Sequence, residues 1–299
     1  MPNPPSRFVV TATLALLIVI WGTTWSVIKI SLGGIPPLTG VAIRFAIASV
    51  LLGAIALARG KSLGSWKSLP IWLVQALLSF SVTYGLVYWA QQWVPSGLTS
   101  LLYSTMPLFV VLFGYVVLPE ERLGPLALVG VAAGFAGVAV IFSDDVGALA
   151  LPEVRWAAGW VLVAPIGGAI AQVVVKRWGQ DLSAFALTAP PMAITALVIG
   201  AFAWRLEQDR AIVWATAPVL ATLYLAVLGS ALNFSLYFWL LKYLSATQLS
   251  LIAYAVPVVA VTVGTLVLDE PLTLRMLAGG ALVVAGVAFA VRPRRTAPA

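Results

Sequence analysis

Ten runs of mainly apolar residues, each close to 20 residues long, account for most of this 299-residue sequence. A helix needs roughly 20 apolar residues to cross the hydrocarbon core of a bilayer, where charged side chains are costly. Charged residues make up only 9% of the chain, too few to cover the surface of a soluble fold. The sequence therefore predicts an all-α integral membrane protein with ten transmembrane helices. The predicted spans cover about residues 9–30, 37–58, 70–91, 96–118, 124–142, 156–176, 183–204, 214–240, 245–268 and 273–291.

The residue types that are missing limit the chemistry of the chain. Cysteine and histidine are both absent, which excludes thiolate catalysis, thiolate metal ligands and the usual proton carrier near neutral pH. The acidic residues lie in the polar breaks between apolar runs. We therefore expect no metal, no cofactor and no enzymatic activity. A membrane-embedded lipid-modifying enzyme, the alternative from another class, would need buried acids, histidine or cysteine.

The chain has a net charge of +7, and its basic residues lie near the ends of the predicted spans. Lys and Arg flank these spans instead of forming a stripe, so we expect no nucleic-acid partner. More of the basic residues fall on the side of the two termini, and basic residues prefer the cytoplasmic side of a membrane. The sequence thus predicts a multi-pass protein in a lipid bilayer, with its N- and C-termini in the cytoplasm.

Two stretches that lie 150 positions apart are closely similar. Ser100–Glu121 reads SLLYSTMPLFVVLFGYVVLPEE, and Ser250–Pro271 reads SLIAYAVPVVAVTVGTLVLDEP. Agreement across several helices indicates an internal repeat. The positions that match at this offset, or at one residue less, are Pro107 with Pro257, Gly114 with Gly264, Glu120 with Glu270, Gly130 with Gly280 and Tyr88 with Tyr237.

Each half of the chain contains five predicted spans, and an odd number inverts the second half relative to the first. We therefore predict one membrane domain built from two five-helix repeats, 1–145 and 146–299, with inverted topology. In secondary transporters such repeats enclose a substrate site near the bilayer midplane. Pro107 and Pro257 fall near the centres of their spans, where proline removes a backbone hydrogen bond. We interpret both as gating hinges, with static kinks as the alternative.

Aromatic and amide side chains inside the spans are the candidate substrate-binding residues. Polar side chains at this depth usually face a bundle interior or a water-filled path, although each could instead join two helices. Trp21 and Trp25 lie one helical turn apart on one face of the first span. Together these residues predict a central chamber. The full set is Trp21, Trp25, Tyr84, Tyr88, Tyr103, Gln172, Asn233, Tyr237 and Tyr254.

The predicted chamber contains no carboxylate, so a strongly cationic substrate would lack a counter-ion there. Four basic residues near its spans are interpreted as helix-end residues whose charged groups reach the membrane surface. They are Lys29, Arg44, Lys176 and Lys242. An uncharged chamber suits a neutral or zwitterionic small molecule.

Small residues are concentrated in the fifth and tenth spans, which carry almost no polar side chains. They permit close approach of helix backbones, so we expect these spans to pack outside the chamber. We expect a monomer, and a dimer formed through this face is the alternative. The residues are Gly130, Gly134, Gly279, Gly280 and Gly286.

Several of these motifs resemble the drug/metabolite transporter superfamily. They are Trp21-Gly22 with Lys29 downstream, Arg44-Phe45, and the mid-span proline followed by an LPEE or LDEP break and a glycine-rich helix. Within that superfamily the chain resembles the ten-helix amino-acid and metabolite exporters of the bacterial inner membrane, including the aromatic amino-acid exporter type. The resemblance implies a 5+5 inverted repeat with peripheral fifth and tenth helices. Gly168 and Ala169 replace the Trp-Gly pair in the second half, which implies asymmetric substrate contacts.

The sequence as a whole favours a secondary transporter that exports amino acids or related small metabolites by alternating access. A carrier of drugs, quaternary cations or nucleotide sugars is the alternative within transport. The lipid-modifying enzyme is the alternative outside it.

Overall fold

A computed structural model describes residues 5–118, 125–143, 148–240, 243 and 251–290, and within them every regular element is a helix. The first half contains α1 (Arg7–Leu32), α2 (Pro37–Ala58), η1 (Trp66–Ser68), α3 (Leu69–Val74), η2 (Gln75–Val82), α4 (Thr83–Ala90), α5 (Ser96–Tyr103), α6 (Met106–Val117) and α7 (Pro125–Phe142). The second half contains η3 (Ala148–Ala150), α8 (Pro152–Val161), α9 (Ala164–Trp178), α10 (Ala189–Leu206), α11 (Thr216–Ala226), η4 (Val227–Leu232), α12 (Asn233–Leu240), α14 (Leu251–Leu268) and α15 (Leu274–Ala290).

Every predicted apolar run contains a helix in the structure. Seven helices or continuous helix runs of the described part are long and apolar enough to cross a membrane. Three further apolar helices are shorter, at Leu128–Phe142, Ala255–Leu268 and Leu274–Gly286. The all-α membrane class is thus confirmed, whereas the full count of ten spans stays a prediction.

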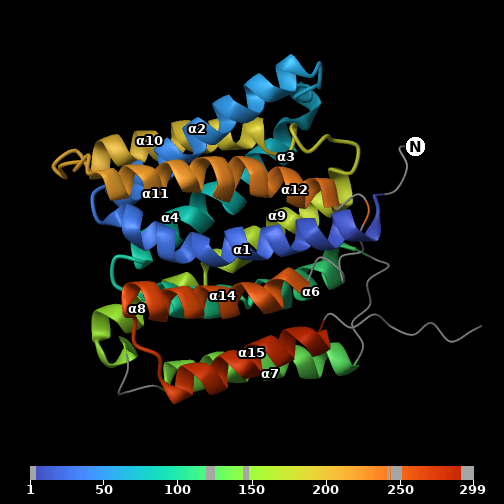
Figure 1. Cartoon of the computed structure of the whole chain (residues 1–299). Helices are drawn as coiled ribbons and strands as arrows, with labels where there is room; N and C mark the ends of the chain where they lie inside the picture. The colour runs from blue at the N-terminus through green and yellow to red at the C-terminus, as the bar shows by residue number, and fades with distance from the viewer. Residues whose placement is uncertain (1–4, 119–124, 144–147, 241–242, 244–250, 291–299) are drawn as a thin grey trace, which may run out of the picture.

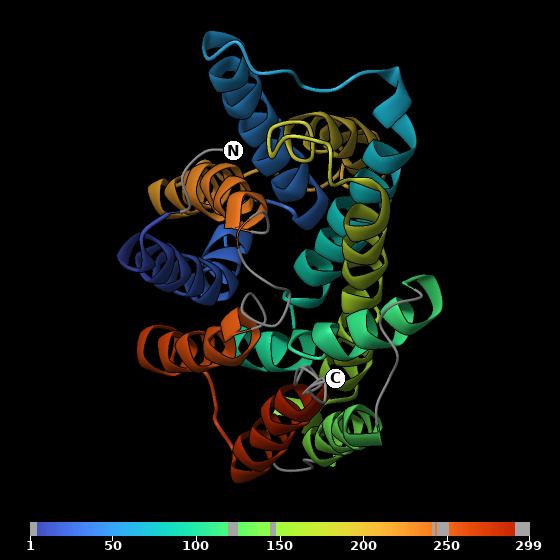
Figure 2. The ribbon, with the colours of Figure 1, turned by 90° about the vertical axis from the view of Figure 1, so that its right-hand side faces the viewer.

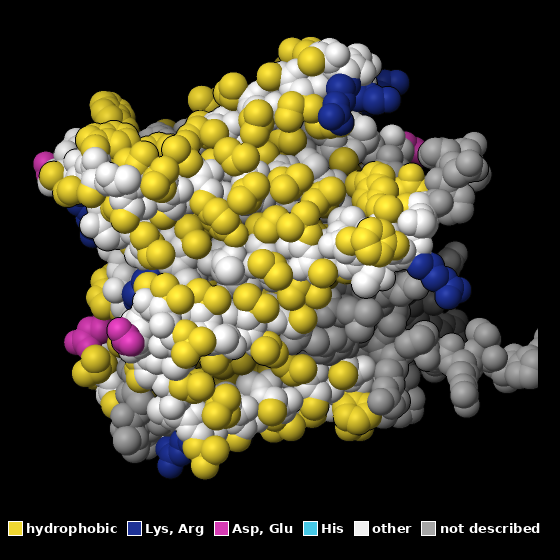
Figure 3. Space-filling view, in the orientation of Figure 1, with side chains coloured by type: hydrophobic (Ala, Val, Ile, Leu, Met, Phe, Trp, Pro, Cys, Tyr) yellow, Lys and Arg dark blue, Asp and Glu magenta, His cyan; other side chains and the backbone are white. Residues whose placement is uncertain are grey.

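The helices lie side by side, and helices of the two halves alternate through the bundle (Figures 1 and 2). The most extensive packing joins α7 with α15, α2 with α10, α1 with α14 and α6 with α9, and each pair takes one helix from each half. Apolar side chains cover much of the face in Figure 3, with Lys, Arg, Asp and Glu mainly toward its edges. Such a surface fits a bundle surrounded by lipid.

Glycines bring α7 and α15 into backbone contact at one edge of the bundle. A Cβ atom on Gly137 would lie 2.6 Å from the Gly279 carbonyl oxygen, and one on Gly279 would lie 2.6 Å from the Gly137 carbonyl oxygen. A Cβ atom on Gly286 would likewise lie 2.6 Å from the Gly130 carbonyl oxygen. These small residues therefore serve close packing within the chain, as the sequence predicts.

The two matched prolines occupy different environments. Pro257 lies inside the continuous helix α14, as predicted. Pro107 does not lie inside a continuous helix, because the span breaks between α5 and α6 and Pro107 is the second residue of α6. At the break, the hydroxyls of Ser104 and Thr105 donate to the carbonyls of Leu101 (2.6 Å) and Leu102 (2.7 Å). These bonds satisfy carbonyls at the end of α5, and proline is well tolerated in the first turn of the helix that follows.

Two segments of π-helix, η2 and η4, interrupt corresponding spans of the two halves. In a π-helix backbone bonds run from i to i+5, and such segments are frequent at functional sites. Each segment receives a bond from a neighbouring helix of the other half. Thr195 of α10 donates its hydroxyl to the Ala76 carbonyl (3.0 Å), and Arg44 of α2 donates Nη2 to the Gly229 carbonyl (3.2 Å).

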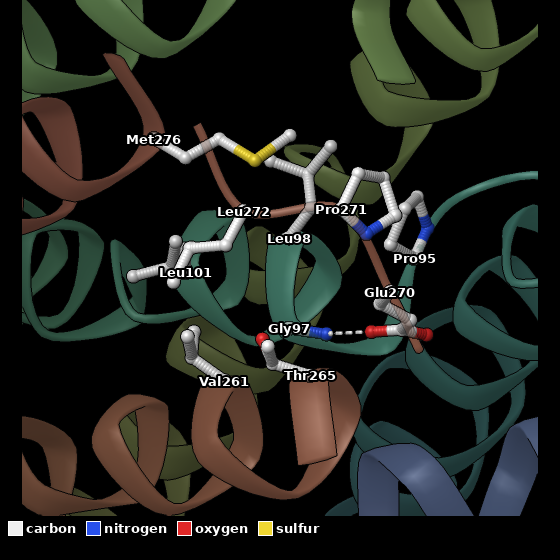
Figure 4. Close-up of a pocket in the computed structure, with 10 residues that line it drawn as sticks. All are labelled: Pro95, Gly97, Leu98, Leu101, Val261, Thr265, Glu270, Pro271, Leu272 and Met276. Atoms are coloured by element: carbon white, nitrogen blue, oxygen red, sulfur yellow. Dashed lines mark hydrogen bonds between the residues drawn. The ribbon is translucent and has the colours of Figure 1, made fainter. Parts of the chain in front are cut away.

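Two glutamates bind the N-terminal ends of helices that are distant in sequence. Glu207 accepts the Leu38 and Thr39 backbone N–H groups of α2 at 2.9 and 2.8 Å. Glu270 accepts the Ser96 and Gly97 N–H groups of α5 at 2.6 and 3.0 Å, as drawn for Gly97 in Figure 4. Because Glu270 is the second residue after α14, the end of α14 lies at the start of α5. The α14 helix is therefore antiparallel to the α5–α6 span.

Candidate substrate site

Trp21 and Trp25 of α1 contact aromatic side chains of two other helices. The Trp21 ring lies 5.4 Å from the Tyr237 ring and 5.7 Å from the Phe234 ring, both on α12. The Trp25 ring lies 5.2 Å from the Tyr103 ring on α5. The four-residue spacing thus directs both indoles into the bundle, toward residues that the sequence also predicts for the site.

Tyr84 extends this group of rings toward α2. Its ring lies 6.4 Å from Phe234 and 5.1 Å from Phe45, and Phe80 lies 5.1 Å from Phe234. Phe45, Phe80 and Phe234 were not among the predicted site residues, because apolar rings within an apolar run carry no signal of their own. The rings contact one another, so they fill the space between α2, α4 and α12.

Two more predicted residues, Tyr103 and Gln172, lie beside these rings. Tyr103 lies near Tyr84 and Tyr237, and the Gln172 side chain of α9 hydrogen-bonds Tyr237. These contacts join side chains from α1, α4, α5, α9 and α12 into one group, which we call the aromatic cluster. Its members are Trp21, Trp25, Tyr84, Tyr103, Gln172, Phe234 and Tyr237.

Three predicted site residues are not part of the aromatic cluster. Two of them lie at other positions in the bundle, and the side chain of the third is outside the described residues. Tyr88 is fully buried, and its hydroxyl accepts a bond from Arg44 Nη1 at 3.4 Å. Asn233 is fully buried as well, and neither polar atom of its amide has a hydrogen-bond partner. The Tyr254 side chain lies outside the described residues, as do Glu120 and Lys242.

For Arg44, the prediction that its charged group reaches the membrane surface from a helix end is wrong. It lies about two turns into α2 and is 0% exposed. Its Nε donates to the Ser230 hydroxyl at 2.7 Å, and its guanidinium carbon lies 4.6 Å from the centroid of the Tyr84 ring. The prediction was wrong because Arg44 faces η4 and α4, whereas a side chain that snorkels must follow a lipid-facing surface. The interior beside the aromatic cluster is therefore charged.

Lys29 lies at the end of α1, as predicted, and takes part in a polar network there. Its Nζ donates to the Val94 carbonyl at 3.1 Å and interacts electrostatically with Glu270. The hydroxyls of Ser26 and Ser96 are 3.1 Å apart, and Ser96 also donates its hydroxyl to Glu270 at 2.9 Å. This network ties α1, α5 and the end of α14 together.

A small, partly open cavity adjoins this network, away from the aromatic cluster (Figure 4). Apolar side chains from α5, α14 and α15 form most of its wall, and Glu270 lies at one edge. Its lining residues are Pro95, Gly97, Leu98, Leu101, Val261, Thr265, Glu270, Pro271, Leu272 and Met276. Because Glu270 is already bound to the start of α5, we assign this cavity to helix packing.

Membrane-length apolar helices around a buried aromatic and polar cluster define a multi-pass membrane protein of the transporter class. Comparison with known proteins gives the family. Residues 10–143 and 155–292 match the model of the EamA-like transporter family, and the chain belongs to this family. The resemblance to the drug/metabolite transporter superfamily is thereby confirmed.

Relatives of similar length support the assignment. The inner membrane transporter YedA of Escherichia coli strain K12 is 32% identical over 276 residues, which cover 92% of this chain and 88% of YedA. The transporter YvbV of Bacillus subtilis is 29% identical over 275 residues, with 92% and 88% covered. Both are named as uncharacterized transporters. A solved crystal structure, 23% identical, has a TM-score of 0.70 and covers 95% of this chain and 97% of its own, which supports the fold.

Proposed function

We propose that the chain is a secondary transporter that exports amino acids or related small metabolites by alternating access. The observation that carries this proposal is the aromatic cluster, to which both halves contribute. Trp21 and Tyr84 come from the first half, and Gln172 and Tyr237 from the second. Rocking of one half against the other would separate these rings and open a path lined by aromatic and amide groups, which suits small zwitterionic molecules.

The proposed inverted repeat, 1–145 and 146–299, has three lines of support. The family model matches two segments of similar length. Contacts between the halves also occur in matched pairs. The contact of α1 with α14 corresponds to that of α9 with α6, and the contact of α2 with η4 corresponds to that of α10 with η2. In addition, α14 runs antiparallel to α5–α6. This is the arrangement expected when two matched spans belong to repeats of opposite orientation. We further propose that Pro107 and Pro257 act as bending points, because each lies in one of these matched spans.

We propose that the protein lies in the bacterial inner membrane with both termini in the cytoplasm. The glycine faces of α7 and α15 are occupied by each other, which favours a monomer. The basic residues on the side of the termini favour this orientation.

Single-cysteine labelling tests the orientation and the repeat together, since the natural chain has no cysteine. Lys61 follows α2 and Asp209 follows α10, and both side chains are exposed. In intact cells a membrane-impermeant maleimide should label Asp209→Cys and leave Lys61→Cys unlabelled. Permeabilised cells, in which both should react, provide the control. Labelling of both from the same side would refute the inverted repeat.

Transport in proteoliposomes tests the function. Purified protein should give saturable flux of at least one radiolabelled amino acid, in competition with unlabelled amino acids. Replacing Trp25 by alanine should reduce this flux about tenfold, because a ring that contacts the substrate contributes roughly 1 kcal/mol or more. Trp66→Ala is the matched control, since Trp66 is 84% exposed and outside the cluster. Flux of drugs, quaternary cations or nucleotide sugars, with none for any amino acid, would favour the alternative carrier.

A further inference from the structure

We propose that Arg44 binds the carboxylate of the transported molecule, so that the site selects solutes with a carboxylate over their amides and amines. This inference rests on the proposed transport function and names the chemical group that the site recognises. It depends on the charge, position and surroundings of one side chain.

The first step concerns the charge. Arg44 is fully buried, and the guanidinium group of an arginine carries a positive charge. Its partners among the described residues are uncharged: the hydroxyls of Ser230 and Tyr88, the Gly229 carbonyl and the rings of Tyr84 and Phe45. Buried charges are usually paired with an opposite charge, because burial removes them from water. The arrangement thus lacks the anion that a guanidinium binds best, a carboxylate or phosphate.

The second step excludes a sufficient structural reason for the charge. Arg44 could be present only to satisfy the Gly229 carbonyl in the π-segment η4. In η2 a carbonyl, that of Ala76, is satisfied by the neutral hydroxyl of Thr195. A π-segment of this protein can therefore be held by an uncharged side chain. The bond to the Gly229 carbonyl therefore does not by itself account for a positive charge at Arg44.

The third step concerns position. The guanidinium lies over the Tyr84 ring, which belongs to the aromatic cluster, and bonds η4 of the opposite half. A Cβ atom on Gly229 would lie 3.4 Å from Arg44 Nη2 and 3.4 Å from Thr24 Oγ1 of α1. Glycine at this position keeps the space beside the guanidinium free of a side chain. Arg44 therefore lies where the two halves meet, beside the proposed path.

Asn233 supplies an independent observation. It lies three residues after Ser230, which binds Arg44, and directly before Phe234 of the aromatic cluster. Its side chain is fully buried with both amide atoms unpartnered, although buried amides are nearly always hydrogen-bonded. An amide can donate to a carboxylate or accept from an ammonium group. Arg44 and Asn233 together match the two polar groups of an amino acid.

Wild-type protein tests the inference without any substitution. Affinities for matched ligand pairs are measured in detergent by quenching of tryptophan fluorescence, with each free amino acid of a panel compared with its amide. The pair 3-phenylpropionate and 3-phenylpropionamide is included as well. The carboxylate member of at least one pair should bind about 30-fold more tightly than its amide, as expected for one charge-assisted interaction in a buried site. The inference is overturned if no carboxylate in the panel binds more tightly than its amide.

Variants then assign the preference to Arg44. Arg44→Gln should remove the difference within a pair, and Arg44→Lys should retain part of it, because lysine keeps the charge and loses the planar fork. Thr195→Val is the matched control, since it removes a π-segment bond without a charge, and the full preference should persist in it. An unchanged preference in Arg44→Gln overturns the inference. If that variant does not fold, the wild-type comparison decides.

The outcomes also separate this inference from the transport proposal. Carboxylate preference without flux of any amino acid would retain Arg44 as the anion-binding group and reject amino-acid transport. Saturable amino-acid flux with equal affinity for acids and amides would retain the transport proposal and reject the role of Arg44.

Discussion

Substitution of Gly22 by leucine should abolish transport and strongly destabilise the protein. Gly22 lies where α14 packs closely against α1, because a Cβ atom added there would overlap Val259 and lie 3.4 Å from the Val256 carbonyl oxygen. The Val259 atoms that it meets are close to the backbone, so they cannot move aside without shifting α14. Overpacking of this kind costs roughly 1–3 kcal/mol, and more when a helix must move.

The effect should reach function because Pro257, the proposed bending point, lies between Val256 and Val259. Thermal unfolding in detergent and flux in proteoliposomes are the measurements. Gly53→Leu is the matched control, since a Cβ atom at Gly53 on α2 would meet nothing within 4 Å. A Gly22→Leu protein with wild-type stability and flux would show that α1 and α14 need not be in close contact.

Replacing Glu270 by glutamine should lower the free energy of unfolding by about 2 kcal/mol, because hydrogen bonds to a charged group contribute about 1.5–3 kcal/mol and Glu270 is half-buried. Its two oxygens accept three donors, namely the Ser96 N–H and hydroxyl and the Gly97 N–H. Glutamine offers one oxygen and directs an NH2 group at the remaining donors. It also removes a negative charge from the N-terminal end of α5, where the helix dipole favours one.

The neighbouring Asp269 provides the control for charge alone. Asp269→Asn also removes one negative charge, but Asp269 is exposed and binds no helix end through the bonds of the described residues. Thermal unfolding in detergent should therefore separate the two variants clearly. Equal stability of Glu270→Gln and Asp269→Asn would mean that the bonds to α5 add nothing.

The fold class followed from the sequence because hydrophobicity alone decides which segments enter lipid. The four-residue spacing of Trp21 and Trp25 predicted that they share one face of α1, whereas their aromatic partners on α5 and α12 are seen only in the structure. Arg44 was misplaced, because an arginine several residues inside an apolar run has the same hydropathy whether it faces lipid or protein. The different positions of Pro107 and Pro257 depend on the hydroxyls of Ser104 and Thr105, because the second repeat has Tyr254 and Ala255 at these positions and so lacks the Ser-Thr pair.

The π-segments could not be predicted, because a change from i+4 to i+5 bonding leaves no pattern in the apolar residues. Their positions matter for the candidate site, since η4 directly precedes α12. Asn233, Phe234 and Tyr237 all come after it along the chain. Only the structure shows that the Gly229 carbonyl within η4 is available to Arg44.

The wider turns of η4 also set the rotational phase of α12. An α-helix advances about 100° per residue around its axis, so one residue more or less in η4 would swing every later side chain by that angle. Phe234 and Tyr237 would then turn away from Trp21, even though the amino acids themselves were unchanged. A deletion in this segment would therefore rotate α12 about its own axis. Any redesign of the pocket must therefore conserve the residue count between Val227 and Leu232.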